Sequence, residues 1–282
     1  FKGDAISTTS ELVKISSDGN LGLEEGQKFE RGGIYRFTVD VTKGNTKAVL
    51  TVEKVGKVDL PAPDIFFGND KMEVTDTDIY KSDQAFTQGQ MITVTGIDNL
   101  NEWWIDPDFF EKQSDGALKF LPINGDYRVT ANAVLKYFSV MALKDGKPAK
   151  LQDDGTGAIW AIGKGIGKPS VTSSEVGWEP SKALCLAQVA SKKYQLTLKA
   201  GETLKTSGDP EVISFKFFHQ NDWGGEFGNY ASSILVEQLK LADSGNLEMQ
   251  DNKAFEEGAV YRFTIDVTNG NANADLKVEK IN

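Results

Sequence analysis

The sequence predicts an all-β protein built from tandem antiparallel β-sandwich domains of an Ig-like type. Three observations predict this fold class: short segments in which apolar and polar residues alternate, turn signals about every ten residues between them, and a long internal repeat. Apolar runs with the spacing of an amphipathic helix are scarce. With 282 residues and about 100–200 residues per domain, the chain has room for two domains and part of a third.

The repeat relates the two ends of the chain. Residues 1–56 align without a gap with residues 227–282, at a constant offset of 226, and 25 of the 56 aligned residues are identical. The best match runs over residues 35–42 and 261–268, which read YRFTVDVT and YRFTIDVT. A fainter third copy lies at residues 125–140. Identity at this level indicates one structural unit that is present more than once.

The repeated segment has the pattern of a β-hairpin. Alternation along residues 34–41 places four apolar side chains on one face, which we expect to be buried: Tyr35, Phe37, Val39 and Val41. Residues 42–45 are a turn signal, and a returning strand begins at Ala48. Three tyrosines closely follow a glycine, as in the tyrosine corner of Greek-key sandwiches, so we expect their hydroxyls to bond nearby backbone: Tyr35, Tyr127 and Tyr261.

Two boundaries divide the chain into three segments. Residues 57–63 form a proline-containing linker, and residues 144–148 form a second, turn-rich boundary. We therefore expect the C-terminal half of a first β-sandwich repeat at 1–57, a middle β-sandwich domain at 58–147 and a C-terminal β-sandwich domain at 148–282. Phe1 aligns with Phe227, and half a sandwich leaves open edges and an uncovered apolar face. Either its first half is missing from the sequence, or it packs on the middle domain.

The acidic balance of the chain excludes some partners. The formal net charge is -10 and the pI is about 4.8, so a phosphate backbone would be repelled and nucleic acid is not an expected partner. No apolar run approaches the ~20 residues of a membrane span. We expect any contact with a membrane to go through a lipid anchor that this sequence does not contain.

Catalytic chemistry has few residues to use. The single histidine, His219, ends a strong strand pattern, and no serine stands in a nucleophile-elbow sequence, so a Ser-His-Asp triad is not expected. A zinc site would need more histidine and cysteine, and we expect neither a metal nor a cofactor. The one cysteine, Cys185, stands in an apolar segment and is expected to be a buried core residue. The protein is therefore expected not to be an enzyme.

Two other segments contain residue types that occur in functional sites, but the spacing of these residues does not match the corresponding motif. In the glycine-rich stretch at residues 163–170, Pro169 breaks the phosphate-loop pattern, so we expect a flexible loop after a strand at 158–162. Asp106 and Asp108 flank a proline. Paired catalytic carboxylates and a calcium site are minor alternatives there, and a turn stabilised by aspartate and proline is the expected structure.

The five tryptophans fall in two clusters and are the strongest candidates for a binding surface. Trp178 and Trp223 stand in turns rich in Gly, Asp and Pro, where an indole is hard to bury, and exposed apolar rings often mark binding sites. Such a ring can stack on the apolar face of a pyranose while polar neighbours bond its hydroxyls. The candidate neighbours are Lys216, His219, Asn221 and Asp222. The alternative is that both rings cap the ends of the sandwich core.

The other three tryptophans are weaker candidates. Trp160 lies on an expected strand between apolar residues. Trp103 and Trp104 are adjacent on one strand, so one should be core and the other exposed, and Trp104 is the one that we assign to binding.

The last domain resembles a known family. WAIG at residues 160–163, GWEP at 177–180, FKF at 215–217 and then Trp223 follow an order similar to that in SusE/SusF-type surface lipoproteins of gut bacterial polysaccharide-utilisation systems. The resemblance implies carbohydrate-binding-module-like sandwiches and non-catalytic binding of starch or another glycan at the cell surface, on the outer membrane. It also implies that Trp178 and Trp223 form the stacking platform and that Lys216 donates to hydroxyls. The middle domain departs from the pattern because it has no Gly-Trp turn.

Two functions follow from these observations. The first is non-catalytic binding of a polysaccharide or oligosaccharide, strengthened by avidity if several domains bind, with other outer-membrane glycan-uptake proteins as further partners. The alternative is a structural Ig-like spacer or protein-partner module of a surface complex. Which glycan is bound, and whether the middle domain binds, stay open at this point.

Overall fold

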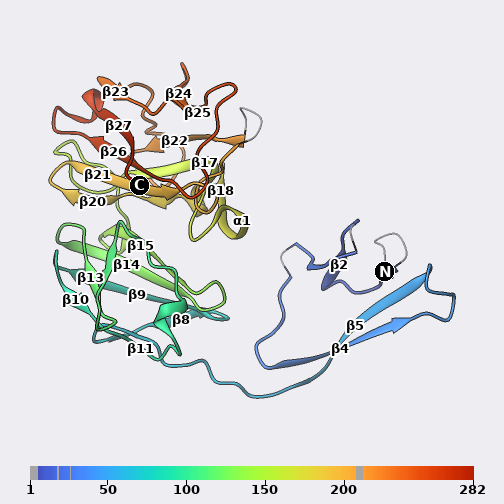
Figure 1. Cartoon of the computed structure of the whole chain (residues 1–282). Helices are drawn as coiled ribbons and strands as arrows, with labels where there is room; N and C mark the ends of the chain where they lie inside the picture. The colour runs from blue at the N-terminus through green and yellow to red at the C-terminus, as the bar shows by residue number, and fades with distance from the viewer. Residues whose placement is uncertain (1–5, 18, 26, 208–211) are drawn as a thin grey trace. The chain divides into compact units, whose positions relative to one another are not determined.

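The computed structural model describes residues 6–17, 19–25, 27–207 and 212–282. Almost all of its regular secondary structure is strand, which confirms the predicted all-β class. The chain divides into two compact units, Phe1–Ala62 and Pro63–Asn282, coloured along the chain in Figure 1. Within the described residues, no helix is long and apolar enough to cross a membrane. Phe1, which the repeat aligns with Phe227, lies outside the described residues.

The described part of the first unit consists of a three-stranded sheet and a hairpin. Its strands are β1 (Ile6–Thr8), β2 (Val13–Ile15), β3 (Leu21–Leu23), β4 (Gly33–Asp40) and β5 (Ala48–Lys57). β5 is central, with β1 parallel to it on one side and β4 antiparallel on the other, while β2 and β3 pair with each other. Each of these strands has a counterpart 226 residues further on, in the last sandwich. The repeat seen in the sequence is therefore also a repeat of strands.

Residues 63–148, all of them described, form a sandwich of one large sheet and two small ones. The strands are β6 (Phe66–Phe67), β7 (Asp70–Lys71), β8 (Glu73–Asp76), β9 (Ile79–Phe86), β10 (Met91–Ile92), β11 (Val94–Thr95), β12 (Phe110–Lys112), β13 (Leu118–Phe120), β14 (Gly125–Asn132), β15 (Tyr137–Lys144) and β16 (Lys147–Pro148), with the short 3-10 helix η2 (Leu100–Glu102). The sheet orders are β16-β15-β14-β9-β8, β10-β13-β12 and β11-β6-β7. In the core, the Phe67 ring contacts Phe110 and Phe138, at centroid distances of 5.5 and 5.2 Å.

The last sandwich pairs two larger sheets. The strands found in its described residues are β17 (Trp160–Gly167), β18 (Glu175–Gly177), β19 (Leu184–Cys185), β20 (Ala187–Ala190), β21 (Lys193–Lys199), β22 (Ser214–Phe218), β23 (Ser232–Ile234), β24 (Leu239–Leu241), β25 (Leu247–Met249), β26 (Val260–Asp266) and β27 (Asp275–Lys280), with helix α1 (Val171–Ser174) and the 3-10 helices η3 (Pro180–Lys182) and η5 (Asn271–Asn273). One sheet has the order β18-β17-β22-β25-β24, with β19 beside β17, and the other has the order β20-β21-β26-β27-β23 (yellow to red in Figure 1). Phe215 and Phe217 of β22 contact Phe263 of β26 at 5.5 and 6.4 Å. The core therefore lies between β22 and β26.

The glycine-rich stretch at residues 163–170 begins as strand, and the flexible loop predicted there is wrong. β17 continues to Gly167, between β18 and β22. At Gly163 the backbone φ is +141°, and an added Cβ would lie 2.4 Å from the Cα of Phe215. Only glycine lets the two strands approach this closely in this conformation. The glycines therefore serve packing inside a sheet.

The apolar face predicted for the repeated hairpin is buried in the last copy only. In β26, Phe263 and Ile265 are fully buried. At the equivalent positions of β4, Phe37 is 50% exposed and Val39 is 43% exposed, so the burial predicted for residues 35–41 is wrong. The alternation is the same in both copies. The difference is the second layer: β26 faces β22, and the described residues of the first unit contain no strand equivalent to β22.

Tyrosine corners form in two of the three predicted places. The Tyr127 hydroxyl donates to the carbonyl of Ile123 at 2.8 Å. The Tyr35 hydroxyl accepts from the backbone N–H of Glu30 at 2.9 Å. At Tyr261, the ring packs edge-on against Phe255 at 4.7 Å.

Candidate functional site

Trp178 and Trp223 form an aromatic pair at the surface of the last sandwich. Their ring centroids lie 6.3 Å apart, and their planes are inclined by 25°. Trp223 is 50% exposed, whereas Trp178 is half-buried and packs against the core. Phe218, which is buried, contacts Trp223 edge-on at 6.0 Å. The pair therefore combines an anchored ring with an accessible ring, an arrangement suited to stacking on the apolar face of a ligand.

A tight turn after β22 positions Trp223. The backbone N–H of Trp223 donates to Oδ1 of Asp222 at 2.8 Å, and Nε2 of Gln220 donates to the carbonyl of Trp223 at 2.6 Å. The backbone N–H of His219 donates to the carbonyl of Gly225 at 2.7 Å and closes the turn. Gln220 helps to position Trp223 and was not among the residues predicted from the sequence. Its location in the same turn is the sequence feature that could have identified it.

Strand alternation places Lys216 on the same face of β22 as Phe218, which is two residues further along the strand. Trp223 packs edge-on against Phe218 and lies beside Trp178. Lys216 therefore points to the side of the sheet on which the two rings lie. This is the outer face, because the residues on either side of Lys216 in β22 point into the core.

The polar groups around the pair differ in what they offer to a ligand. Lys216 is half-buried and forms no ion pair with any residue that the structure describes. Asn221 is half-buried and Asp222 is exposed, both in the turn that carries Trp223. The geometry thus brings together Trp178, Trp223 and Lys216 on one face, with Asn221 and Asp222 adjacent in the chain to Trp223.

One ring nitrogen of His219, Nε2, is buried. Its ring packs edge-on against Phe227 at 4.2 Å. Nε2 is covered by protein and has no hydrogen-bond partner among the described residues, and burial lowers the pKa of the ring. The hydroxyl-bonding role predicted for His219 is therefore wrong for Nε2.

Trp160 and Trp103 belong to the core. Trp160 is fully buried, and its Nε1 donates to the carbonyl of Ala149 at 3.0 Å. The prediction that Trp160 contributes to the binding surface is wrong, because protein covers β17 at this position and its apolar neighbours on the strand are buried as well. Trp103 is buried and stacks on Phe138, with centroids 4.6 Å apart, which confirms that one of the two adjacent tryptophans is core.

Trp104 is half-buried between the middle and last sandwiches. It lines a cavity of about 360 Å³ together with Tyr137 and Lys182. Its indole N–H donates to Oε1 of Glu202 at 2.9 Å. Trp104 is therefore not a freely exposed ring, and its polar edge is already engaged by the neighbouring sandwich.

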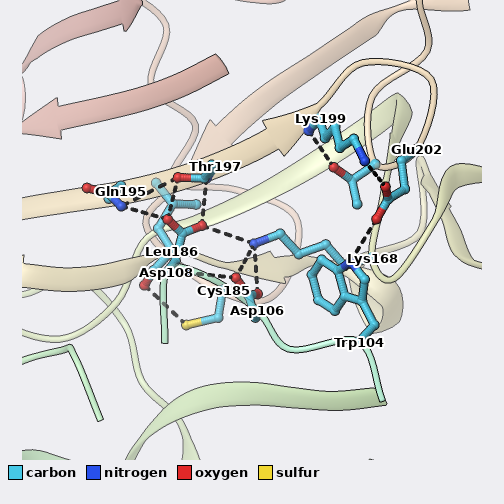
Figure 2. Close-up of polar contacts among 11 residues, drawn as sticks. Trp104, Asp106, Asp108, Lys168, Cys185, Leu186, Gln195, Thr197, Lys199 and Glu202 are labelled. Atoms are coloured by element: carbon cyan, nitrogen blue, oxygen red, sulfur yellow. Dashed lines mark hydrogen bonds and ion pairs between the residues drawn. The ribbon is translucent and has the colours of Figure 1, made fainter. Parts of the chain in front are cut away.

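A buried ion cluster joins the two sandwiches beside Trp104 (Figure 2). Nζ of Lys168 lies 2.8 and 2.7 Å from the two carboxylate oxygens of Asp106 and 3.1 Å from Oδ2 of Asp108. Asp108 also accepts from the backbone N–H and the hydroxyl of Thr197, both at 2.6 Å, and from Gln195 at 2.7 Å. All three charged residues are buried. The middle sandwich supplies both carboxylates, and the last sandwich supplies their partners.

This cluster settles the alternatives for the two aspartates. The predicted turn is present, since the backbone N–H of Asp108 donates to Oδ1 of Asp106 at 3.0 Å. The Lys168 ammonium bonds both carboxylates, so the alternatives of a calcium ion held by them and of a free catalytic pair are wrong.

The protonation of the cluster follows from burial and charge. Burial raises the pKa of Asp106. Burial also acts to raise the pKa of Asp108, but Lys168 and the hydrogen bonds from Thr197 and Gln195 outweigh it and lower that pKa. Burial raises the pKa of the nearby Cys185 thiol to about 12, so this buried cysteine is a thiol at neutral pH, as expected for a core residue.

The fold defines a tandem β-sandwich protein. The chain belongs to the DUF5121 family, described as a domain of unknown function, whose model matches residues 1–42 and 154–268, more than half of the chain. A model of a second domain of unknown function, DUF5125, matches residues 46–151. The two DUF5121 matches end at Thr42 and Thr268, which are the same position of the repeat.

The crystal structure of SusF from Bacteroides thetaiotaomicron is similar to 96% of this chain, at 15% sequence identity and a TM-score of 0.29. This chain spans 65% of that chain. No curated protein matches the sequence.

Proposed function

We propose that the protein binds a polysaccharide, starch-like or another neutral glycan, without cleaving it. The observation that carries the proposal is the pair of nearly parallel rings of Trp178 and Trp223, one of them half exposed at 50%. A large apolar ring held outward by a hydrogen-bonded turn is costly to keep in water unless a ligand covers it. The C–H face of a pyranose is flat, apolar and of similar size.

Polar groups beside the rings would orient the sugar. Lys216 has ammonium donors on the face of β22 that carries Phe218, the residue that Trp223 contacts, and it has no ion pair among the described residues. Asn221 and Asp222 add an amide and a carboxylate next to Trp223. Hydroxyls both donate and accept, so this mixture suits a neutral polyol. A net charge of -10 disfavours an acidic glycan.

The location and partners are further parts of this proposal. The order of motifs in the last domain supports a surface protein of the outer membrane, held by a lipid anchor and working beside other glycan-uptake proteins. Trp104 would contribute only through the ring face that lines the cavity between the sandwiches, because its N–H is bonded to Glu202.

Affinity electrophoresis tests the proposal. The protein is run through native gels that contain starch, other α-glucans, β-glucans or mannans. We expect retardation in one of them, and we expect Trp178→Ala and Trp223→Ala each to weaken binding about tenfold or more, equivalent to about 1.4 kcal/mol or more. Phe37→Ala is the matched control, because Phe37 has the same exposed fraction as Trp223, 50%, in the first unit. It should leave retardation unchanged.

Free migration in every gel, or equal loss of binding in the Phe37→Ala control, would contradict the proposal. The spacer or protein-partner function would then be preferred. Circular dichroism of each variant separates a lost site from a lost fold, and the exposed position of Trp223 predicts that Trp223→Ala folds normally.

A further inference from the structure

The first unit exposes an apolar face that its own repeat buries. Phe37 is 50% exposed, whereas its counterpart Phe263 is fully buried. The same change occurs at five further positions, on β3, on β4 and in the segments beside them. The exposed side chains are Leu21, Leu23, Phe29, Val39 and Val41, and their buried counterparts are Leu247, Met249, Phe255, Ile265 and Val267. The exposed face of the first unit therefore has the apolar side chains of a sandwich core.

The last sandwich shows what covers this face. Phe215 and Phe217 of β22 pack on Phe263 across the core. β21 pairs along the whole of β26, with Lys193–Lys199 opposite Val260–Asp266. β22 also pairs with β25, the counterpart of β3. One half-sandwich therefore supplies both a covering layer and two hydrogen-bonded strands.

Among the described residues of the first unit, the same hydrogen-bonding edges have no partner strand. β4 is the edge strand of its sheet, where β26 has a strand on each side. β3 belongs to a two-stranded sheet with β2, where β25 lies between β22 and β24. An edge strand presents a row of backbone donors and acceptors that another strand can pair with.

We propose that the face formed by β3 and β4 is the docking surface for a polypeptide of the same kind as residues 158–218 of this chain, the first half of a DUF5121 sandwich. The docked segment adds one antiparallel strand to β4 and another to β3, and its inward aromatic residues cover Phe37. This is β-strand addition combined with closure of a sandwich core. It rests on the repeat and on burial, and it is independent of glycan binding.

Two other occupants fit the surface less well. A second copy that pairs β4 with β4 would satisfy the edge but would leave the face of the sheet without a second layer. A glycan would offer hydroxyls to a surface that needs apolar side chains and a strand in register.

A fusion tests the proposal directly. A second copy of residues 148–226 is placed before Phe1, so that Glu226 joins Phe1 as it joins Phe227 in the last sandwich. We expect the backbone amides of β4 to exchange with deuterium about a hundredfold more slowly than in the unfused chain. We also expect the binding of a dye for exposed apolar surface to fall.

Two variants make the test specific to the face. In the fusion, Phe37→Asp places a charge in the new core and should return β4 to fast exchange. Thr38→Asp, on the opposite face of the same strand, should leave the slow exchange intact.

A peptide added in solution provides a second test in case the added half-sandwich of the fusion does not fold. A peptide of residues 192–200, which contains β21, is added in excess to the unfused chain. We expect slower exchange in β4 of the wild type and no change in Phe37→Asp. If neither the fusion nor the peptide slows exchange in β4, the proposal is refuted. It is also refuted if the unfused chain already protects β4 by forming dimers in sedimentation experiments, because a second copy would then be the occupant.

Discussion

The substitution Lys168→Met tests the ion cluster between the two sandwiches. Methionine keeps the length and apolar stem of lysine but removes the ammonium group, so the cavity is filled while the charge is lost. Asp106 and Asp108 would then be left buried with no cation between them. The change therefore isolates the electrostatic contribution of a single group.

The magnitude follows from the burial of all three residues. Removing one partner of a buried ion pair costs about 3–5 kcal/mol, because the remaining charge keeps its desolvation penalty. Lys168 is only 7% exposed and makes three short contacts to the carboxylates, so the full range applies. In a unit of this size, that loss lowers Tm by roughly 6–20 °C.

The pH dependence gives a second signature. In Lys168→Met, the loss of the counter-ion leaves burial to hold the pKa of Asp106 further above its unfolded value. A raised carboxyl pKa gives stability that is present below the unfolded pKa, about 3.9 for aspartate, and is lost as the pH rises. The variant should therefore become more stable when the pH falls from 8 to 5, relative to the wild type.

Thermal and urea unfolding measure both effects. The control is Lys164→Met, an exposed lysine of β17, the strand that ends just before Lys168. This change should alter the free energy of unfolding by less than about 0.5 kcal/mol. A loss below about 1 kcal/mol in Lys168→Met, together with an unchanged pH profile, would show that water reaches the carboxylates and would refute the reasoning.

Three further substitutions have definite expected outcomes. Gly163→Ala should cost about 3 kcal/mol or more in urea unfolding, because the new Cβ would lie 2.4 Å from the Cα of Phe215 and φ is +141°; a neutral result would contradict the close approach. Tyr127→Phe removes the hydrogen bond to Ile123 and should cost about 1 kcal/mol, with no change in glycan binding. In Asp108→Asn, the free energy of unfolding should fall less steeply below about pH 4 than in the wild type. The reason is that a lowered carboxyl pKa gives stability that is present above the unfolded pKa and is lost as the pH falls. The same pH dependence below about pH 4 in variant and wild type would contradict this prediction.

Local pattern was enough to predict the strands and one pair of surface rings. Alternation identified β4 and β26, and the repeat related them because the same residues recur at one offset. Trp178 and Trp223 were predicted to be surface rings because their turns contain residues that cannot continue a strand. The structure brings these two rings together, and their contact with a glycan stays a prediction.

The remaining features depend on partners distant in the sequence. Lys168 meets Asp106 across 62 positions, and neither residue carries a local sign of the other. The exposure of Phe37 depends on whether a second layer is present, which its own strand cannot encode. Trp160 shows the same limit, because a ring on a strand is core or surface according to what packs over it.

The close contact of β17 and β22 at Gly163 also bears on how such a protein can diverge. Any side chain at that position collides with backbone, so sequence drift there is stopped by sterics whatever the sandwich binds. The turns that carry Trp178 and Trp223 lie outside this contact, and surface turns in general tolerate substitution better than packed strands do. The contact between the two strands and the two tryptophan turns can therefore change at different rates as the sequence diverges.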